Sequence, residues 1–250
     1  MRPRWLALGA LLACRPRAHS DRSDGRLPSL AVKRAPEGSL RVDGALDEAP
    51  WATAGRTGPL VHPGTGREEP ASRVQAEARL LWDATGLYLG IRVRDPSPDR
   101  PFTNTARDPH VWERSSGVEL MLQPGDPGDN RDYFELQVDT AGAVWSTRFE
   151  DYNRPISRGP DGATRYGHQD WDPAVSVASR ADREGYTLEL RLPWSALTGV
   201  GAQVPPRNGD AWRANVYTFR DGQRDSLAWS PLLGQGNFHR ASRWGRLRFE

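Results

Sequence analysis

Apolar and polar residues alternate with a period of two in segment after segment of this chain. The clearest segments are 87–93, 118–122, 134–138, 186–192 and 212–216. Successive side chains of a β-strand point to opposite faces of a sheet, so this pattern predicts strands with one face in a core and the other toward solvent or a ligand. Turn-forming residues separate the segments, at 83–86, 95–98, 124–130, 159–162 and 205–209.

Helical patterns are confined to two short stretches, Asp47–Trp51 and Trp194–Leu197, each of a turn or two. Many antiparallel strands, few helices and long polar loops predict an all-β fold, a β-sandwich or jelly roll. No internal repeat of fixed period is present, which argues against a propeller or a solenoid. A chain of 250 residues can form one such domain with a sizeable core.

The first 20 residues have the features of an export signal. Two arginines precede the apolar run Trp5–Ala13, which is too short to cross a bilayer as a stable anchor. The run ends directly before Cys14, in a context that resembles the bacterial lipobox, whose cysteine is lipidated. We therefore expect a signal peptide over residues 1–20 with lipidation at Cys14. Ordinary cleavage after Ala18-His19-Ser20 is the alternative.

Cys14 is the only cysteine, so the folded domain has no disulfide, no Cys-ligated zinc and no catalytic cysteine. Residues 21–37 are polar and contain proline and glycine, and we expect them to form a flexible tether before a domain over residues 38–250. No later segment is long and apolar enough to cross a bilayer. These features predict an exported protein, lipid-anchored to the outer or inner membrane of the cell envelope. A secreted or periplasmic protein is the alternative.

The net charge and the tryptophan content of the chain indicate which kinds of molecule it could bind. The formal net charge is only +2, with acidic and basic residues interspersed, which gives no electrostatic case for nucleic acid. The chain has 10 tryptophans, and this side chain commonly either fills a core or stacks on a ligand as an exposed flat ring. Five tryptophans lie in apolar-patterned contexts and are expected in the core: Trp51, Trp82, Trp194, Trp212 and Trp244.

Several stretches follow one another in a recognisable order. They read VDGALDEAPW from residue 42, ARLLWDATGLYL from residue 78, WERSSGVEL from residue 112, GYTLELRLPW from residue 185, WRAN from residue 212 and FHRASRWGRL from residue 238. This order resembles the family 9 carbohydrate-binding modules and their DOMON-like relatives. The resemblance covers about residues 38–250 and implies a β-sandwich that grips sugars, often at a chain end, commonly with structural calcium.

The resemblance also implies a sugar site. A sugar offers apolar C–H faces and rings of hydroxyls, so a binder needs flat aromatic surfaces and fixed hydrogen-bonding groups. The family pattern assigns Trp112 to one wall of a sugar clamp, Phe238 to the other wall and Glu119 to a hydroxyl contact. The residues expected beside Phe238 are Asn237, His239 and Arg240.

Each of these assignments has a plainer alternative. Trp112 could cap an edge of the sandwich, Glu119 could be a solvated strand residue, and Phe238 could belong to the core. The chain also departs from the family pattern at two places. It has Ser116-Gly117 where the family often has an aspartate before its Val-Glu pair, and it has Phe238 where well-studied sugar binders have a tryptophan.

The expected partner is a polysaccharide or oligosaccharide of the xylan or cellulose type, and the expected role is to assist its recognition or catabolism without catalysis. Asp43, Asp47 and Asp95 lie in predicted turns and could supply the hard oxygen ligands that calcium prefers. Turn aspartates more often bond their own backbone, so no cofactor is required by this pattern and structural calcium is a secondary expectation.

Two other functions stay open at the level of the sequence. A glycoside hydrolase needs two carboxylates across a cleft, and the strand carboxylates available are Glu119, Glu135 and Glu189. A haem-binding electron-transfer domain, as in some DOMON-like relatives, could use Met121 as one axial ligand. The histidines that could pair with Met121 are His110, His168 and His239. A protein-binding or scaffold role at the cell surface is a further alternative.

Overall fold

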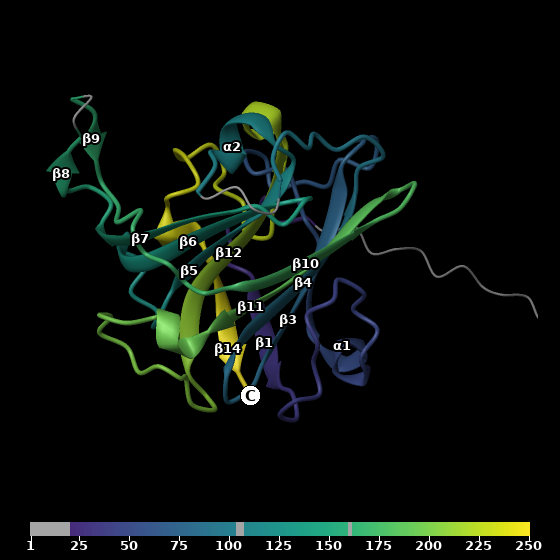
Figure 1. Ribbon diagram of the computed structural model, residues 1–250, viewed down its shortest axis with the longest axis horizontal. Coiled ribbons are helices and arrows are strands. Elements are labelled where there is room, and N and C mark those ends of the chain that lie inside the picture. Colours follow the sequence, from purple (N-terminus) through teal and green to yellow (C-terminus); the bar gives the residue numbers. More distant parts are fainter. Residues whose placement is uncertain (1–20, 104–107, 160–161) are drawn as a thin grey trace, which may run out of the picture.

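The computed structural model describes residues 21–103, 108–159 and 162–250 (Figure 1). Within these residues, 12 strands form one curled sheet whose two halves pack face to face as a sandwich. The predicted all-β sandwich is confirmed. The expected signal peptide, including Cys14, lies outside the described residues. Among the described residues, no helix is both long enough and apolar enough to span a membrane.

One half of the sheet contains the alternating segments predicted around residues 87–93 and 186–192. Its strands, in spatial order, are β10 (Ser176–Ala181), β11 (Gly185–Pro193), β4 (Gly86–Arg94), β3 (Gln75–Trp82) and β1 (Ser29–Arg34), with β2 (Gly55–Pro59) beside β3. Neighbouring strands are antiparallel except β1, which pairs in parallel with β3.

The other half contains the segments predicted around residues 118–122, 134–138 and 212–216. Its strands, in spatial order, are β14 (Gly245–Phe249), β12 (Ala211–Arg220), β5 (Gly117–Gln123), β6 (Arg131–Asp139) and β7 (Val144–Asp151), with β13 (Arg224–Ala228) beside β12. A small hairpin of β8 (Ser157–Arg158) and β9 (Thr164–Arg165) projects from this half (Figure 1).

Strand β1 joins the two halves, because it pairs with β14 on one side and with β3 on the other. Its residues Leu30 and Val32 are buried in the core. The expectation of a flexible tether over residues 21–37 is therefore wrong for this segment. Arg22 is also held, since its guanidinium donates to the backbone oxygens of Thr57 and Pro59 at 2.6 and 3.0 Å.

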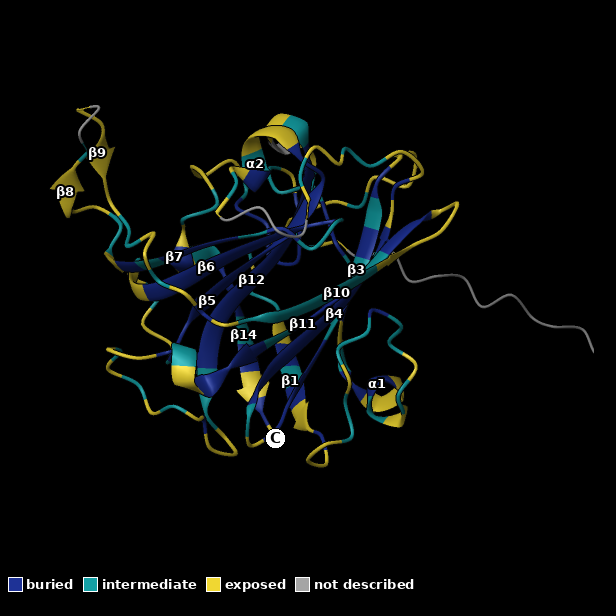
Figure 2. Cartoon of the chain, in the orientation of Figure 1, coloured by how far each residue is buried: buried dark blue, intermediate teal, exposed yellow. Residues whose placement is uncertain are grey.

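The main core lies between the two halves and is filled by the apolar face of each strand, as the alternation predicts. Trp82, Trp194 and Trp212 are buried there, in edge-to-face contact with Phe249. The outer faces are covered as well, so that most strand residues are buried on both sides (Figure 2). The outer faces therefore point to solvent less than the alternation predicts.

The outer face beside β3 and β4 is covered by the N-terminal segment and helix α1 (Ala49–Thr53). Trp51 is buried there, and its indole nitrogen donates to Glu189 at 3.2 Å. The same carboxylate accepts from the backbone nitrogens of Asp43 and Gly44. The remaining short helices are α2 (Val111–Arg114), η1 (Trp194–Ala196), η2 (Asp221–Gln223) and η3 (Ala241–Arg243).

Candidate functional site

Three polar or aromatic side chains form a row across the outer face of β6, β5 and β12. The strand register places Gln137 opposite Glu119 and Glu119 opposite Tyr217. Directly opposed residues of antiparallel strands share one face of a sheet. This face points away from the main core, because Val118 and Leu120, the neighbours of Glu119, are in that core.

Two carboxylates share one hydrogen-bond donor in this row. The side-chain nitrogen of Gln137 donates to Glu119 Oε2 at 2.9 Å and to Glu135 Oε1 at 2.7 Å. The other carboxylate oxygens, Glu119 Oε1 and Glu135 Oε2, are buried and accept no hydrogen bond from the described residues. Buried polar atoms are normally hydrogen-bonded, so these two oxygens are the positions at which a ligand would form hydrogen bonds with the pair.

Burial governs the charge of this pair. Only 1% of Glu119 is exposed, so its interpretation as a solvated strand residue is wrong. Burial raises the pKa of Glu135 to about 8, against the opposing effect of the Gln137 hydrogen bond. Burial, followed by repulsion from Glu135, also raises the pKa of Glu119 well above its ordinary value. Low dielectric surroundings disfavour the charged form of both carboxylates.

Trp112 is held at the Gln137 end of the row. It lies on α2, and its backbone nitrogen donates to Gln137 Oε1 at 3.1 Å. Its indole is half-buried, with the His110 ring stacked on it at a centroid distance of 4.6 Å and Trp145 in edge contact. One amide side chain therefore connects the helix of Trp112 to both buried carboxylates.

Phe238 is held at the Tyr217 end of the row. Its ring is half-buried and stacks on Tyr217 at 4.0 Å with an interplanar angle of 4°. The backbone oxygen of Phe238 accepts from the Tyr217 hydroxyl at 3.3 Å and from the indole of Trp244 at 3.0 Å. Phe238 and Trp112 both pack against the cluster of Val111, Trp145 and Phe219, so the two rings lie at the same end of the sheet.

The residues that flank Phe238 are arranged around Tyr133 and Tyr152. The Nδ1 atom of His239 lies 2.7 Å from the Tyr133 hydroxyl, and the ring stacks on Tyr152 at 4.2 Å. Burial lowers the pKa of His239 to about 4, so the ring is neutral at neutral pH. Asn237 donates to the Tyr152 hydroxyl at 2.8 Å, and Arg240 is exposed beside them.

The structure separates the residues of the hydrolase alternative. Glu119 and Glu135 lie together, whereas Glu189 lies on β11 in the other half of the sheet, where it holds the N-terminal segment. Glu189 is therefore not a partner for either carboxylate across one cleft.

The expected calcium ligands are not brought together either. Asp43 pairs with Arg41 and Arg180, Asp95 pairs with Arg220, and Asp47 is exposed. Across the described ranges, no three His, Cys, Asp or Glu side chains lie close enough together to hold a metal. These aspartates do not fit a shared calcium site.

The residues of the haem alternative are already engaged elsewhere. Met121 is fully buried among Tyr133, Tyr217 and Trp244. Of the histidines named for it, His239 bonds Tyr133, His110 stacks on Trp112, and His168 lies 3.4 Å from Glu150. This packing does not fit axial ligation of a haem iron.

The sequence model of the family described as carbohydrate family 9 binding domain-like matches residues 42–250. The chain belongs to this family. The resemblance read from the ordered stretches of the sequence is thereby confirmed. No curated protein matches the chain significantly.

Three solved structures extend the comparison. A family 9 carbohydrate-binding module from Caldicellulosiruptor kristjanssonii in complex with cellotriose has a TM-score of 0.60 at 15% identity, over 89% of this chain and 93% of that one. Its glucose complex has a TM-score of 0.60 at 16% identity, over 89% and 95%. A candidate carbohydrate-binding protein from Bacteroides uniformis ATCC 8492 has a TM-score of 0.67 at 20% identity, over 90% and 100%. At these identities the likeness shows the shared fold.

The candidate site contains residues that the sequence did not assign to it. Gln137, Tyr217, Tyr133 and Tyr152 contact the predicted residues directly. A signal for Gln137 was present, because β5 and β6 both alternate on either side of the turn-forming segment 124–130. Tyr217 and Tyr133 lie on β12 and β6, but their contacts with Phe238 and His239 depend on a loop far away in the sequence, as does the contact of Tyr152, which follows β7.

Proposed function

We propose that this chain binds a saccharide between Trp112 and Phe238, over the row formed by Gln137, Glu119 and Tyr217. The observation that supports this most is the order of that row. One aromatic wall is tied to Gln137, the other is stacked on Tyr217, and Glu119 lies between them with a buried oxygen that lacks a hydrogen-bond partner among the described residues.

The chemistry of a pyranose suits this arrangement. Its C–H faces would pack against the two rings, each of which is backed on one side by another ring, His110 or Tyr217. Its hydroxyls would hydrogen-bond to the two carboxyl oxygens that lack a partner among the described residues, Glu119 Oε1 and Glu135 Oε2. A hollow of about 390 Å³ adjoins Phe238, and its lining includes Glu69, Ser72 and Asp225. This space could receive the next sugar of an oligosaccharide.

The ligand class we propose is a cellulose- or xylan-type oligosaccharide. The cellotriose and glucose complexes of the Caldicellulosiruptor module support the choice of glucose-based ligands for the first test. Calorimetric titration of residues 21–250 with cellotriose and xylotriose should give saturable binding, and Glu119→Gln should weaken it. Because burial favours the neutral form of Glu119, the scale of the loss is that of an uncharged hydrogen bond, about 0.5–1.5 kcal/mol.

The control for Glu119→Gln is Glu77→Gln, which removes a carboxylate from β3 on the other half of the sheet. It should bind as the unaltered domain does. Absence of binding to any oligosaccharide on a glycan array would contradict the proposed function.

We further propose that the chain is exported and lipid-anchored through Cys14, because the only cysteine directly follows the apolar run Trp5–Ala13. Cys14→Ser in the full chain should move the protein from the membrane fraction to the soluble fraction. Unchanged fractionation of this variant would contradict the anchor.

A further inference from the structure

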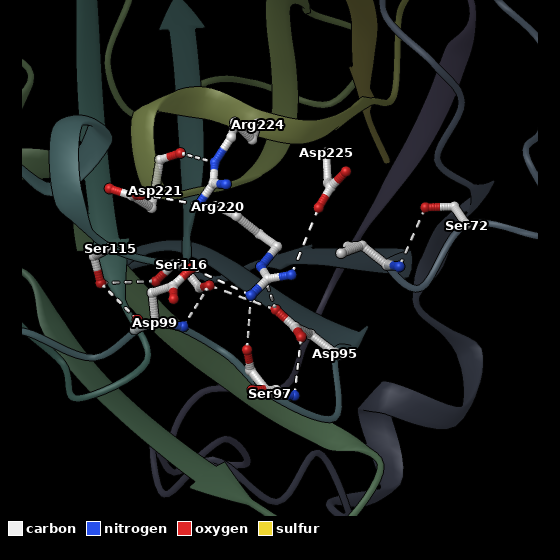
Figure 3. Close-up of polar contacts among 11 residues, drawn as sticks. Ser72, Asp95, Ser97, Asp99, Ser115, Ser116, Arg220, Asp221, Arg224 and Asp225 are labelled. Atoms are coloured by element: carbon white, nitrogen blue, oxygen red, sulfur yellow. Dashed lines mark hydrogen bonds and ion pairs between the residues drawn. The ribbon is translucent and has the colours of Figure 1, made fainter.

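A buried arginine lies where carboxylates from the loop after β4 and from strand β13 converge. The side chain of Arg220, at the end of β12, is only 10% exposed. Its Nε lies 3.5 Å from Asp95 and its Nη2 lies 3.3 Å from Asp99. Its Nη1 lies 3.6 Å from Asp225, and its Nη2 donates to the backbone oxygen of Ser97 at 2.9 Å (Figure 3).

These partners connect parts of the chain that are distant in sequence. Asp95, Ser97 and Asp99 follow β4 in one half of the sheet, whereas Asp225 belongs to β13 beside β12 in the other half. Carboxylate and carbonyl oxygens that converge in this way attract a cation, although no three carboxylates of the described residues are close enough together to hold a metal. Here the guanidinium occupies the centre of the set (Figure 3).

The same aspartates fix the end of helix α2. The Asp99 backbone oxygen accepts from Ser116 N at 2.9 Å and from Ser115 Oγ at 3.1 Å, and Asp99 N donates to Ser116 Oγ at 2.9 Å. Ser116 Oγ also lies 3.5 Å from Asp95 Oδ2. Ser115 closes the helix, because its backbone nitrogen donates to Val111 O at 3.0 Å.

A second connection runs through the turn that follows Arg220. Residues Asp221–Gln223 form η2, which lies against α2. The Arg220 side chain is therefore connected to helix α2, which carries Trp112, by two routes. One runs through the aspartates of the loop after β4, and the other runs through the η2 turn after β12. Loss of the positive charge would leave Asp95, which is 1% exposed, without a cation and would loosen both connections.

We propose that Arg220 is a positioning residue of the saccharide site, an internal cation that does the work of a structural metal by holding α2, and with it Trp112, over the sheet. This inference rests on the proposed function for its link to saccharide.

The test compares Arg220→Gln, Arg220→Lys and the control Arg224→Gln. Arg224 comes from the same hairpin, but its side chain is 66% exposed and pairs only with Asp221 among the described carboxylates. Hydrogen exchange of the peptide covering residues 108–117 is measured for each folded variant, beside thermal melts with EDTA and with calcium. Neither measurement requires a sugar, so both remain informative if the domain fails to bind saccharide.

The unaltered domain should melt at the same temperature in EDTA and in calcium, because the cation of the cluster is the Arg220 side chain, which a chelator cannot remove. Arg220→Gln should exchange faster over residues 108–117 and bind cellotriose about tenfold more weakly, the effect of about 1.4 kcal/mol. Arg220→Lys should give an exchange rate and an affinity between those of the unaltered domain and of Arg220→Gln. If Arg220→Gln does not fold, Arg220→Lys provides the exchange measurement. Arg224→Gln should match the unaltered domain. A lower melting temperature of the unaltered domain in EDTA, or unchanged exchange and affinity in Arg220→Gln, would overturn the proposal.

Discussion

At the scale of single residues, the fold controls the charge of Glu135. Its pKa of about 8 means that the folded state holds a proton which the unfolded state releases near the ordinary value of 4.5. The folded state then binds more protons above about pH 4.5, so stability falls as pH rises toward 8. The lowered pKa of His239 has the opposite sign, but its effect is complete by about pH 6.5.

Glu135→Gln should therefore flatten the pH dependence of stability. Between about pH 6.5 and 8.5 the free energy of unfolding of the unaltered domain should fall, by up to about 1.4 kcal/mol per pH unit for one proton. The variant keeps the acceptor for Gln137 and loses the titrating group, so its slope should be shallower, with Glu119 still contributing. Urea denaturation at several pH values measures this. Glu37→Gln, at an exposed position, is the control, and equal slopes in Glu135→Gln and Glu37→Gln would contradict the account.

The place of Phe238 at the site predicts how a larger ring there changes cellotriose affinity and melting temperature. Because its ring is half-buried and lies flat on Tyr217, Phe238→Trp should extend the wall without invading the main core. Cellotriose affinity should hold or rise, and the melting temperature should change little. If Phe238 instead behaves as a core residue, the larger ring would overpack its site and lower the melting temperature by several degrees, about 1–3 kcal/mol.

At the scale of elements, the sequence predicted the strands better than it predicted which helices and loops cover the outer faces of the sheet. The alternating segments became β4, β5, β6, β11 and β12, because period-two patterning reflects the main core directly. The burial of Glu119 could not be predicted that way, since its cover comes from α2 and the loop around Phe238. Strand β1 was missed because only Leu30 and Val32 face the core within a short polar segment.

The junction between α2 and β5 depends on close packing at Gly117. A Cβ atom there would lie 2.9 Å from the Val138 backbone oxygen, 3.1 Å from Val111 and 3.2 Å from Phe219. Gly117→Ala should therefore displace α2, destabilise the domain by about 1–3 kcal/mol and weaken saccharide binding. Gly201→Ala is the matched control, because a Cβ at Gly201 meets nothing within 4 Å. Equal melting temperatures for the two variants would show that this junction tolerates the extra methyl group.

At the scale of the whole molecule, β1 decides where the folded unit begins. It pairs with both halves of the sheet, so its removal would expose the edges of β3 and β14 and empty the sites of Leu30 and Val32. Residues 21–250 should fold and melt cooperatively, with a sheet spectrum by circular dichroism. Residues 36–250 should show no cooperative transition. A stable, cooperative fold for the shorter chain would mean that β1 is an accessory strand.

The central claim is that Trp112 forms one wall of a saccharide site. Calorimetric titration of cellotriose into residues 21–250 and into its Trp112→Ala variant tests this claim most directly. Loss of the indole removes both apolar contact and ring stacking, the latter worth about 0.5–1.5 kcal/mol beyond area burial. Affinity should therefore fall by at least about tenfold, with partial recovery in Trp112→Phe. Full cellotriose affinity in a folded Trp112→Ala variant would contradict the account.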